Sequence, residues 1–224
     1  MTADIDQPAL GPQLPPLVLP HCRRVVARPD RALRITAFGS STTEGIGASS
    51  PETSYVAVTR RAMLPHIPRI TLVNRGIGGN NAIDLHGRID DVIGDAPDLV
   101  LFQTGSNDPL QDVPLERFEQ QTRADLAQLR ARTQADIVLI DQQLCRALEE
   151  CLSFPQFLTS LHRIGHEAEI PVFPRYRLMQ HWCSLPGLDR DTLSPDGLHM
   201  GDRGYALLGE ALSGWLLGGL AVRS

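Results

Sequence analysis

Short apolar runs alternate with segments of helical periodicity along most of this chain. The runs occupy residues 33–37, 70–74, 99–104, 137–141 and 171–173, and most positions in them are apolar. Such runs are typical of strands buried on both faces of a parallel sheet. Helical spacing appears between the third and fourth runs and near the end of the chain, at Leu115, Phe118, Thr122, Leu126 and Leu129, then at Tyr205, Leu208, Leu212 and Trp215. The alternation predicts an α/β fold, with helices covering a parallel sheet of about five strands.

The domain organisation follows from length and from the proline-rich start. The 224 residues are enough for one substantial core, and no linker-like stretch divides them. We expect residues 1–31 to form an N-terminal arm that is disordered or lies on the surface, and residues 32–224 to form a single domain. The start lacks the basic residues of a signal peptide, and no apolar run is long enough for a membrane span. A cytoplasmic location is therefore expected.

Composition excludes several kinds of chemistry. The formal net charge of −5 gives no reason to expect a nucleic-acid partner. All 21 basic residues are arginine, so the chain has no lysine. Schiff-base enzymes, serine–lysine dyads and the phosphate-binding lysine of a P-loop all need an amine. Histidine is therefore the candidate general base, with 7 copies available.

A serine follows the first predicted strand, in the turn Gly39-Ser40-Ser41-Thr42. Near the other end, Asp196 and His199 lie three residues apart, close enough to meet across one turn. A serine hydroxyl is a poor nucleophile until a histidine takes its proton and a third group orients that histidine. This combination predicts acyl transfer.

The loops after the second and third predicted strands offer hydrogen-bond donors. Residues 76–80 begin like a dinucleotide-binding fingerprint, but Asn81 stands where the third glycine belongs. Gly79 fits either a plain tight turn or a backbone N–H that points into an oxyanion site. Asn107 fits either an Asx turn or an amide that donates to a developing alkoxide. Ligands of parallel sheets bind beyond the carboxyl ends of the strands, so Ser41, Gly79 and Asn107 are expected at one edge.

These segments together resemble the SGNH hydrolases, also called GDSL esterases and lipases. Residues 39–42 are similar to the nucleophile block of that family, and Gly79 falls on the glycine of its second block. Residues 105–108, Gly-Ser-Asn-Asp, match the Gly-x-Asn-Asp pattern of the third block, and residues 196–199 match the final Asp-x-x-His. The resemblance covers residues 33–217. It implies a three-layer α/β/α sandwich with a flavodoxin-like strand order.

The resemblance also implies roles for individual residues. Ser41 is the nucleophile, and its N–H, the Gly79 N–H and the Asn107 side chain form the oxyanion hole. One position departs from the family pattern, because Ser40 replaces the usual aspartate before the nucleophile. That aspartate is not part of the family's catalytic triad, so the change concerns the geometry of the loop more than the reaction.

The expected function is a serine hydrolase that cleaves small, acetyl-like esters through an acyl-enzyme on Ser41. His199 takes the Ser41 proton, and Asp196 fixes the histidine tautomer. No metal or organic cofactor is required. The substrate is a small ester, such as an acylated sugar or lipid. An acyltransferase on the same scaffold and a catalytically silent ligand-binding member remain open, and the sequence does not indicate an oligomeric state.

Two further groups have alternative interpretations. Cys145, Cys151, His162 and His166 could be compared with a zinc site, but their spacing departs from that of zinc fingers, and ordinary buried thiols beside a polar helix face are expected. Tyr176 and Trp182 lie between the last predicted strand and the histidine block. They fit either a wall of the substrate site or the core.

Overall fold

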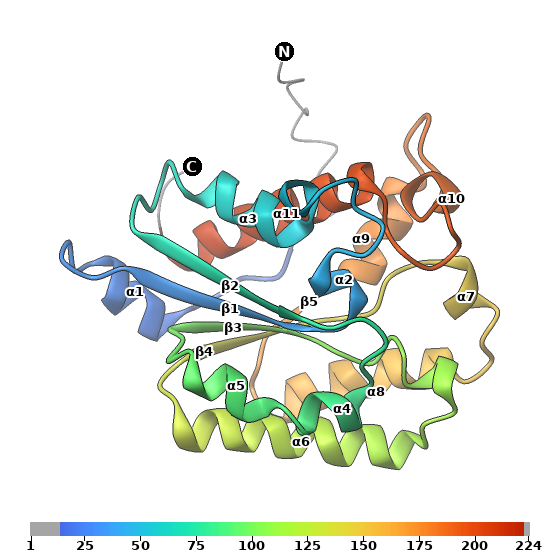
Figure 1. Cartoon of the computed structure of the whole chain (residues 1–224), viewed down its shortest axis with the longest axis horizontal. Helices are drawn as coiled ribbons and strands as arrows, with labels where there is room; N and C mark the ends of the chain where they lie inside the picture. The colour runs from blue at the N-terminus through green and yellow to red at the C-terminus, as the bar shows by residue number, and fades with distance from the viewer. Residues whose placement is uncertain (1–13, 222–224) are drawn as a thin grey trace.

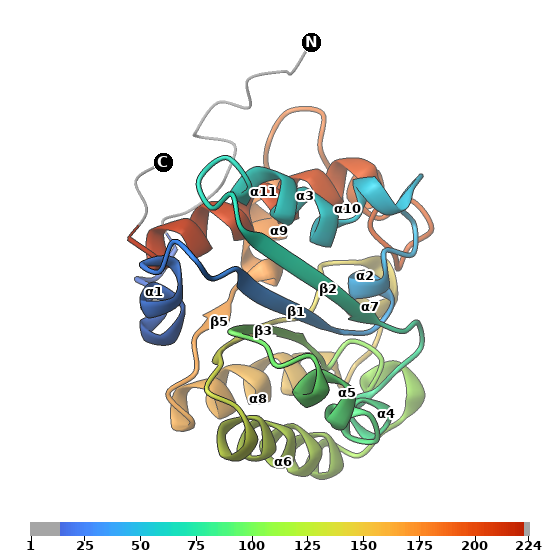
Figure 2. The same ribbon diagram turned by 60° about the vertical axis from the view of Figure 1, so that its left-hand side comes forward.

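The computed structural model describes residues 14–221, which form a five-stranded, all-parallel sheet between layers of helices (Figures 1 and 2). The strands are β1 (Leu33–Gly39), β2 (Ile70–Gly76), β3 (Leu99–Gln103), β4 (Asp136–Ile140) and β5 (Val172–Phe173). Their order in the sheet is β2-β1-β3-β4-β5. The predicted α/β/α sandwich with a flavodoxin-like order is confirmed, and each predicted strand is present with ends that differ by one or two residues.

Each face of the sheet carries its own hydrophobic core. On one face lie α1 (Pro20–Val26), α3 (Tyr55–Met63), α9 (Arg175–Trp182) and α11 (Asp202–Gly219). The opposite face carries α4 (Ala82–His86), α5 (Ile89–Gly94), α6 (Leu115–Arg132) and α8 (Phe154–Glu167). Three single-turn helices, α2 (Ser41–Glu44), α7 (Arg146–Glu149) and α10 (Arg190–Leu193), lie in the connections, with 3₁₀ turns at Pro51–Thr53 and Pro109–Gln111.

The helical periodicity marks the faces that the cores bury. In α6 the side chains of Phe118, Thr122, Leu126 and Leu129 are buried, and in α11 those of Tyr205, Leu208, Leu212 and Trp215 are buried. β3 is buried along its whole length. β2 differs from the expectation of two buried faces, because it is an edge strand and the Val73 side chain is 38% exposed.

The end of the predicted arm is part of the folded core. Leu17 and Leu19 are buried, and the Trp215 indole N–H donates to the Pro15 carbonyl oxygen at 2.7 Å. Pro20 occupies the first turn of α1, a position that suits its fixed φ angle and its missing N–H. The segment before α1 therefore packs against α11 and α1 packs against the sheet, so residues 14–27 do not lie loosely on the surface. Residues 1–13 of the predicted arm lie outside the described residues.

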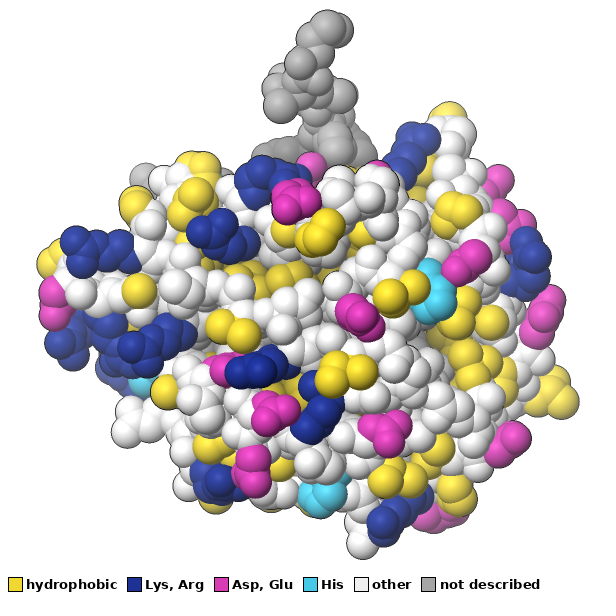
Figure 3. Space-filling model, viewed as in Figure 1, with side chains coloured by type: hydrophobic (Ala, Val, Ile, Leu, Met, Phe, Trp, Pro, Cys, Tyr) yellow, Lys and Arg dark blue, Asp and Glu magenta, His cyan; other side chains and the backbone are white. Residues whose placement is uncertain are grey.

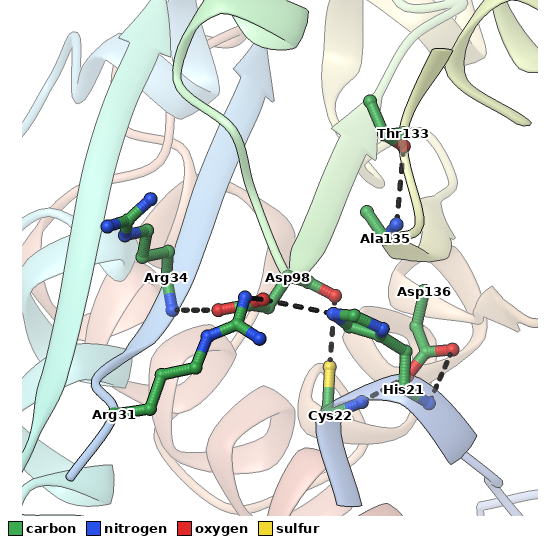
Figure 4. A network of polar contacts seen from close by, with 8 residues as sticks. All are labelled: His21, Cys22, Arg31, Arg34, Asp98, Thr133, Ala135 and Asp136. Atoms are coloured by element: carbon green, nitrogen blue, oxygen red, sulfur yellow. Dashed lines mark hydrogen bonds and ion pairs between the residues drawn. The ribbon is translucent and has the colours of Figure 1, made fainter. Parts of the chain in front are cut away.

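A polar network fastens α1 to the amino-terminal ends of β3 and β4 (Figure 4). The Asp136 carboxylate accepts the N–H groups of His21 and Cys22 at 3.3 and 2.9 Å, which satisfies open donors at the start of the helix. Asp98 is 1% exposed and receives the Arg31 guanidinium at 2.6 Å. This network closes the end of the sheet opposite the loops that carry Ser41, Gly79 and Asn107.

Within residues 14–221, no helix combines the length and the apolar character needed to cross a bilayer.

Candidate active site

The turn after β1 presents Ser41 as the first residue of α2, with Ser40 as its N-cap. The Gln103 side-chain oxygen accepts the Ser40 N–H at 2.9 Å and the Ser40 hydroxyl at 3.1 Å. A Cβ on Gly39 would lie 2.6 Å from that same oxygen, so only glycine lets β1 come this close to Gln103. The Ser40 hydroxyl is thus buried and bonded to Gln103, whereas Ser41 is the first residue of α2.

The acid–base pair lies between α10 and α11. His199 Nδ1 is 2.7 Å from Asp196 Oδ2, and Asp196 Oδ1 accepts the N–H groups of Leu198 and His199 at 2.8 and 2.6 Å. Partial burial raises the pKa of Asp196, but the hydrogen bonds from the His199 ring and the two N–H groups outweigh it and hold the pKa below its ordinary value. Asp196 is therefore an ionised partner that fixes the imidazole.

Three contacts bring the histidine block to the turn that follows Ser41. A Cβ on Gly47 would lie 3.1 Å from the His199 Cβ and 2.5 Å from the Met200 carbonyl oxygen, and Gly47 has a φ of +92°, which favours glycine. The Tyr205 hydroxyl donates to the Ile46 carbonyl oxygen at 2.6 Å. Asp202 accepts the Ser49 hydroxyl at 2.6 Å.

The structure thus places Ser41, Asp196 and His199 at the same edge of the sheet. No hydrogen bond joins the Ser41 hydroxyl to the His199 ring among the described residues. Such bonds are often long before substrate binds, and they tighten in the reacting complex.

The loop after β2 lies against α2. A Cβ at Gly76 would overlap the Glu44 backbone, and the Gly78 N–H donates to the Glu44 carboxylate at 2.5 Å. Gly79 has a φ of +78°, and a Cβ there would meet no atom within 4 Å, so this glycine faces open space. In residues 14–221, neither the Ser41 N–H nor the Gly79 N–H donates to a protein acceptor. Both donors are free to receive a ligand oxygen.

Asn107, in the loop after β3, completes the predicted oxyanion donors. Its amide donates one hydrogen to the Asn80 carbonyl oxygen at 2.8 Å, and its side chain is mostly buried. An amide nitrogen carries two hydrogens, so the second one remains for a ligand. The bond to Asn80 orients Asn107 next to the loop that bears Gly79.

Two neighbours hold the loops after β2 and β3 in register. The Arg88 guanidinium donates to the carbonyl oxygens of Gly39 and Arg75, each at 3.0 Å, and to the Asn80 side-chain oxygen at 2.7 Å. Asp108 accepts the Ala82 N–H at 2.9 Å, and burial raises the pKa of its carboxyl to about 6. These contacts leave little freedom for the segments that carry the donors.

The two proposed substrate contacts have different surroundings. Tyr176 is partly buried, with its ring 5.5 Å from the Phe154 ring, in a small cluster that also includes Leu198 beside His199. Trp182 is fully buried in the larger core and cannot line a surface, so it belongs to the core alternative. Trp182 is the last residue of α9, and its indole packs into the core.

The cysteine and histidine group is dispersed. Cys145 is buried and Cys151 half-buried, both as free thiols, and the His162 ring pairs with the Asp141 carboxylate at 2.8 Å. Within the described residues, no three such side chains are arranged to hold a metal ion.

The sequence model of the Non-GDSL lipase-like family matches residues 13–222. The chain belongs to the Non-GDSL lipase-like family. Membership identifies it as a carboxylic ester hydrolase of the SGNH/GDSL-like type, in agreement with the four blocks read from the sequence.

Several solved structures have a fold similar to that of this Non-GDSL lipase-like protein. Axe2, an acetylxylan esterase from Geobacillus stearothermophilus, is 23% identical, with a TM-score of 0.70 over 86% of this chain and 97% of Axe2. A protein assigned to the lipolytic G-D-S-L family from Desulfitobacterium hafniense DCB-2 is 24% identical, with a TM-score of 0.68 over 81% of this chain and 98% of that one. LAE5, an α/β hydrolase from the metagenome of Lake Arreo, Spain, is 19% identical, with a TM-score of 0.69 over 86% and 98%. No curated protein matches the sequence.

Sequence reasoning missed Gln103 and Arg88 as residues that shape this site. Gln103 is the polar end of an otherwise apolar strand. A polar residue at the carboxyl end of a buried strand is the signal that could have identified Gln103. Arg88 offered no comparable signal, because its contacts are to backbone oxygens and to one amide.

Proposed function

We propose that this Non-GDSL lipase-like protein hydrolyses short acyl esters through an acyl-enzyme on Ser41. The observation that carries the proposal is the His199–Asp196 pair, 2.7 Å apart, packed against the turn that follows Ser41. The same edge holds free N–H groups at Ser41 and Gly79 and a spare amide hydrogen on Asn107.

In the acylation step the Ser41 oxygen attacks the ester carbonyl carbon while His199 Nε2 takes the hydroxyl proton. Asp196 keeps the proton of His199 on Nδ1, so that Nε2 presents a lone pair, and it stabilises the imidazolium that forms. The negative charge that develops on the carbonyl oxygen is met by the Ser41, Gly79 and Asn107 donors. The imidazolium then gives its proton to the departing alcohol as the carbon–oxygen bond breaks.

Deacylation repeats these steps with water as the nucleophile. His199 takes a proton from water, the resulting hydroxide attacks the acyl carbon, and Ser41 leaves with the proton from His199. The products are a carboxylic acid and an alcohol. The chain's own groups supply every proton transfer in this cycle.

Two features support a short acyl group. The open space at Gly79 and the exposed side chains of Ile46 and Ile77, 41% and 48% accessible, describe an open edge. The similarity to Axe2 supports an acetyl ester, because that neighbour is an acetylxylan esterase. An open site gives little burial to each added methylene, so a longer acyl chain gains little binding energy there. An acylated sugar fits this arrangement, with its alcohol portion left in solvent.

Activity is therefore expected to fall with acyl length. Across acetyl, butyryl, octanoyl and palmitoyl esters of one leaving group, kcat/KM is expected to be highest for acetyl or butyryl and about tenfold or more lower for octanoyl. Steady-state hydrolysis of the four esters measures this. A maximum at octanoyl or beyond would favour a lipase or a long-chain thioesterase.

Loss of the Asn107 amide is expected to reduce turnover. Asn107→Ala should lower kcat by about 10²–10³-fold, because the amide donates mainly to the charged transition state. The melting temperature and the KM should change little. Steady-state kinetics on a short-chain p-nitrophenyl ester separates the outcomes, and a change confined to KM would mean that Asn107 binds ground-state substrate.

A further inference from the structure

A chain of buried polar side chains connects the loops of the site from below. The Gln103 amide nitrogen donates to the Ser106 hydroxyl at 3.4 Å, and that hydroxyl donates to the Gln143 side-chain oxygen at 3.0 Å. The Gln143 amide nitrogen donates to the Leu198 carbonyl oxygen at 3.3 Å, one residue before His199. Gln103, Ser106 and Gln143 are each 3% exposed or less. One continuous network therefore joins the nucleophile turn, the oxyanion loop and the histidine block.

Arg175 anchors this network at its buried end. Its side chain is fully buried, and it donates to the Gln143 oxygen at 2.9 Å and to the Asp141 carbonyl oxygen at 2.8 Å. Arg175 begins the same helix as Tyr176 and Trp182, for which the sequence left a wall of the substrate site and the core open, and its side chain lies in the interior. Burial lowers the pKa of the guanidinium, which shows the cost of keeping this charge away from water.

The two fixed ends of the network decide which way Gln143 points. A guanidinium only donates hydrogen bonds, and a backbone carbonyl oxygen only accepts them. The Gln143 oxygen must therefore face Arg175, and its nitrogen must face Leu198. At Gln103 the same logic applies, because the Ser40 N–H is a donor and fixes the amide oxygen on that side. Neither amide can flip without leaving buried groups unpaired.

Stability alone does not account for this arrangement. Replacing a buried charge and its partners by well-packed apolar side chains is often neutral or stabilising. A network that costs desolvation, and that contacts three separate loops of the site, is better explained by the need to hold those loops at fixed distances. Displacing a reacting group by about 1 Å can cost about 10²-fold in rate.

We propose that Gln143, oriented by the buried Arg175, is a positioning residue that sets His199 relative to Ser41 and the oxyanion donors through the Leu198 carbonyl. This role rests on the proposed function, in which His199 is the general base. Gln143 does not touch the substrate. It acts on the rate by fixing the segment from which the imidazole projects.

Gln143→Glu tests the contact with Leu198 selectively. Glutamate keeps an oxygen toward Arg175 and Ser106, but it places a second oxygen against the Leu198 carbonyl, where the amide donated. The expected result on p-nitrophenyl acetate is a kcat lower by about 10- to 100-fold, with KM within about threefold of wild type. Gln143→Met adds no charge but removes both the donor to Leu198 and the acceptor for Arg175 and Ser106. It is expected to lower kcat by at least as much, which provides the measurement if the glutamate variant does not fold. Gln121→Glu, the same change at a buried glutamine of α6, is the control and should keep the wild-type kcat.

A double-mutant comparison distinguishes positioning from a general structural effect. In a His199→Ala background, Gln143→Glu should not lower the residual rate further, because the group that it positions is already gone. An equal fold-loss in both backgrounds would overturn the proposal, as would a wild-type kcat in both Gln143 variants. Ser41→Ala separates this from the proposed function. If Ser41→Ala is inactive and the Gln143 variants are fully active, only the positioning role fails, whereas an active Ser41→Ala removes the proposed function itself.

Discussion

Ser41→Ala is expected to lower ester turnover by at least about 10⁴-fold, because the oxygen that forms the acyl-enzyme is removed. The fold should be unaffected, since in residues 14–221 no hydrogen bond of the Ser41 hydroxyl is lost. Hydrolysis of p-nitrophenyl acetate measures the rate. Covalent labelling of the intact protein by a fluorophosphonate, followed by mass spectrometry, measures the nucleophile directly and should disappear in the variant.

The neighbouring serine provides a matched control. Ser40→Ala removes a hydroxyl from the same turn, but that hydroxyl is hydrogen-bonded to Gln103 and held below the surface. This variant should retain fluorophosphonate labelling at Ser41 and measurable turnover. Labelling that maps to Ser40, or wild-type rates in Ser41→Ala, would refute the assignment of the nucleophile. Loss of labelling in Ser41→Ala alone would also count against a catalytically silent member.

The layer structure could be predicted because its determinants are local and repetitive. Each strand is a short apolar run, and the parallel order follows from the helices between the runs. The burial of each strand was harder to predict, because Val73 is apolar and yet lies half-exposed on the edge strand β2. The N-terminal prolines suggested an arm, whereas Leu17 and Leu19 supply the apolar surface that draws the segment into the core.

Site residues could be predicted where a sequence motif directly follows the end of a predicted strand. Ser41, Gly79 and Asn107 each follow a strand whose end the apolar pattern marks, so their shared edge could be derived before any coordinates. The supporting contacts could not, because they join residues far apart in the sequence. Arg175 is an example, since a charged residue at the start of a helix is ordinarily placed in solvent, and only the fold shows that Gln143 and Asp141 surround it.

Asp196→Asn is expected to lower kcat by about 10⁴-fold while the local fold is kept. The asparagine oxygen can still accept the N–H groups of Leu198 and His199, which now bond to Asp196 Oδ1. The amide nitrogen then faces His199 Nδ1 as a donor, in place of the carboxylate oxygen at 2.7 Å. The imidazole must carry its proton on Nε2, the atom that has to accept the Ser41 proton. The enzyme would hold its base in the wrong tautomer.

Stability should respond to this change in a pH-dependent way that is separate from the rate. The folded protein holds the pKa of Asp196 below its ordinary value, so the ionised carboxylate stabilises the fold above the unfolded pKa and loses that contribution as the pH falls. Asp196→Asn should therefore melt at a lower temperature than wild type at about pH 7, and the difference should shrink toward about pH 3. Asp189→Asn is the matched control, because Asp189 accepts the Thr192 N–H at 2.6 Å, and hydrogen bonds from the Thr192 side chain and N–H lower the pKa of Asp189 as well. That variant should show a similar melting behaviour with wild-type kcat. Equal turnover in the two variants would mean that Asp196 serves the fold and not the histidine tautomer.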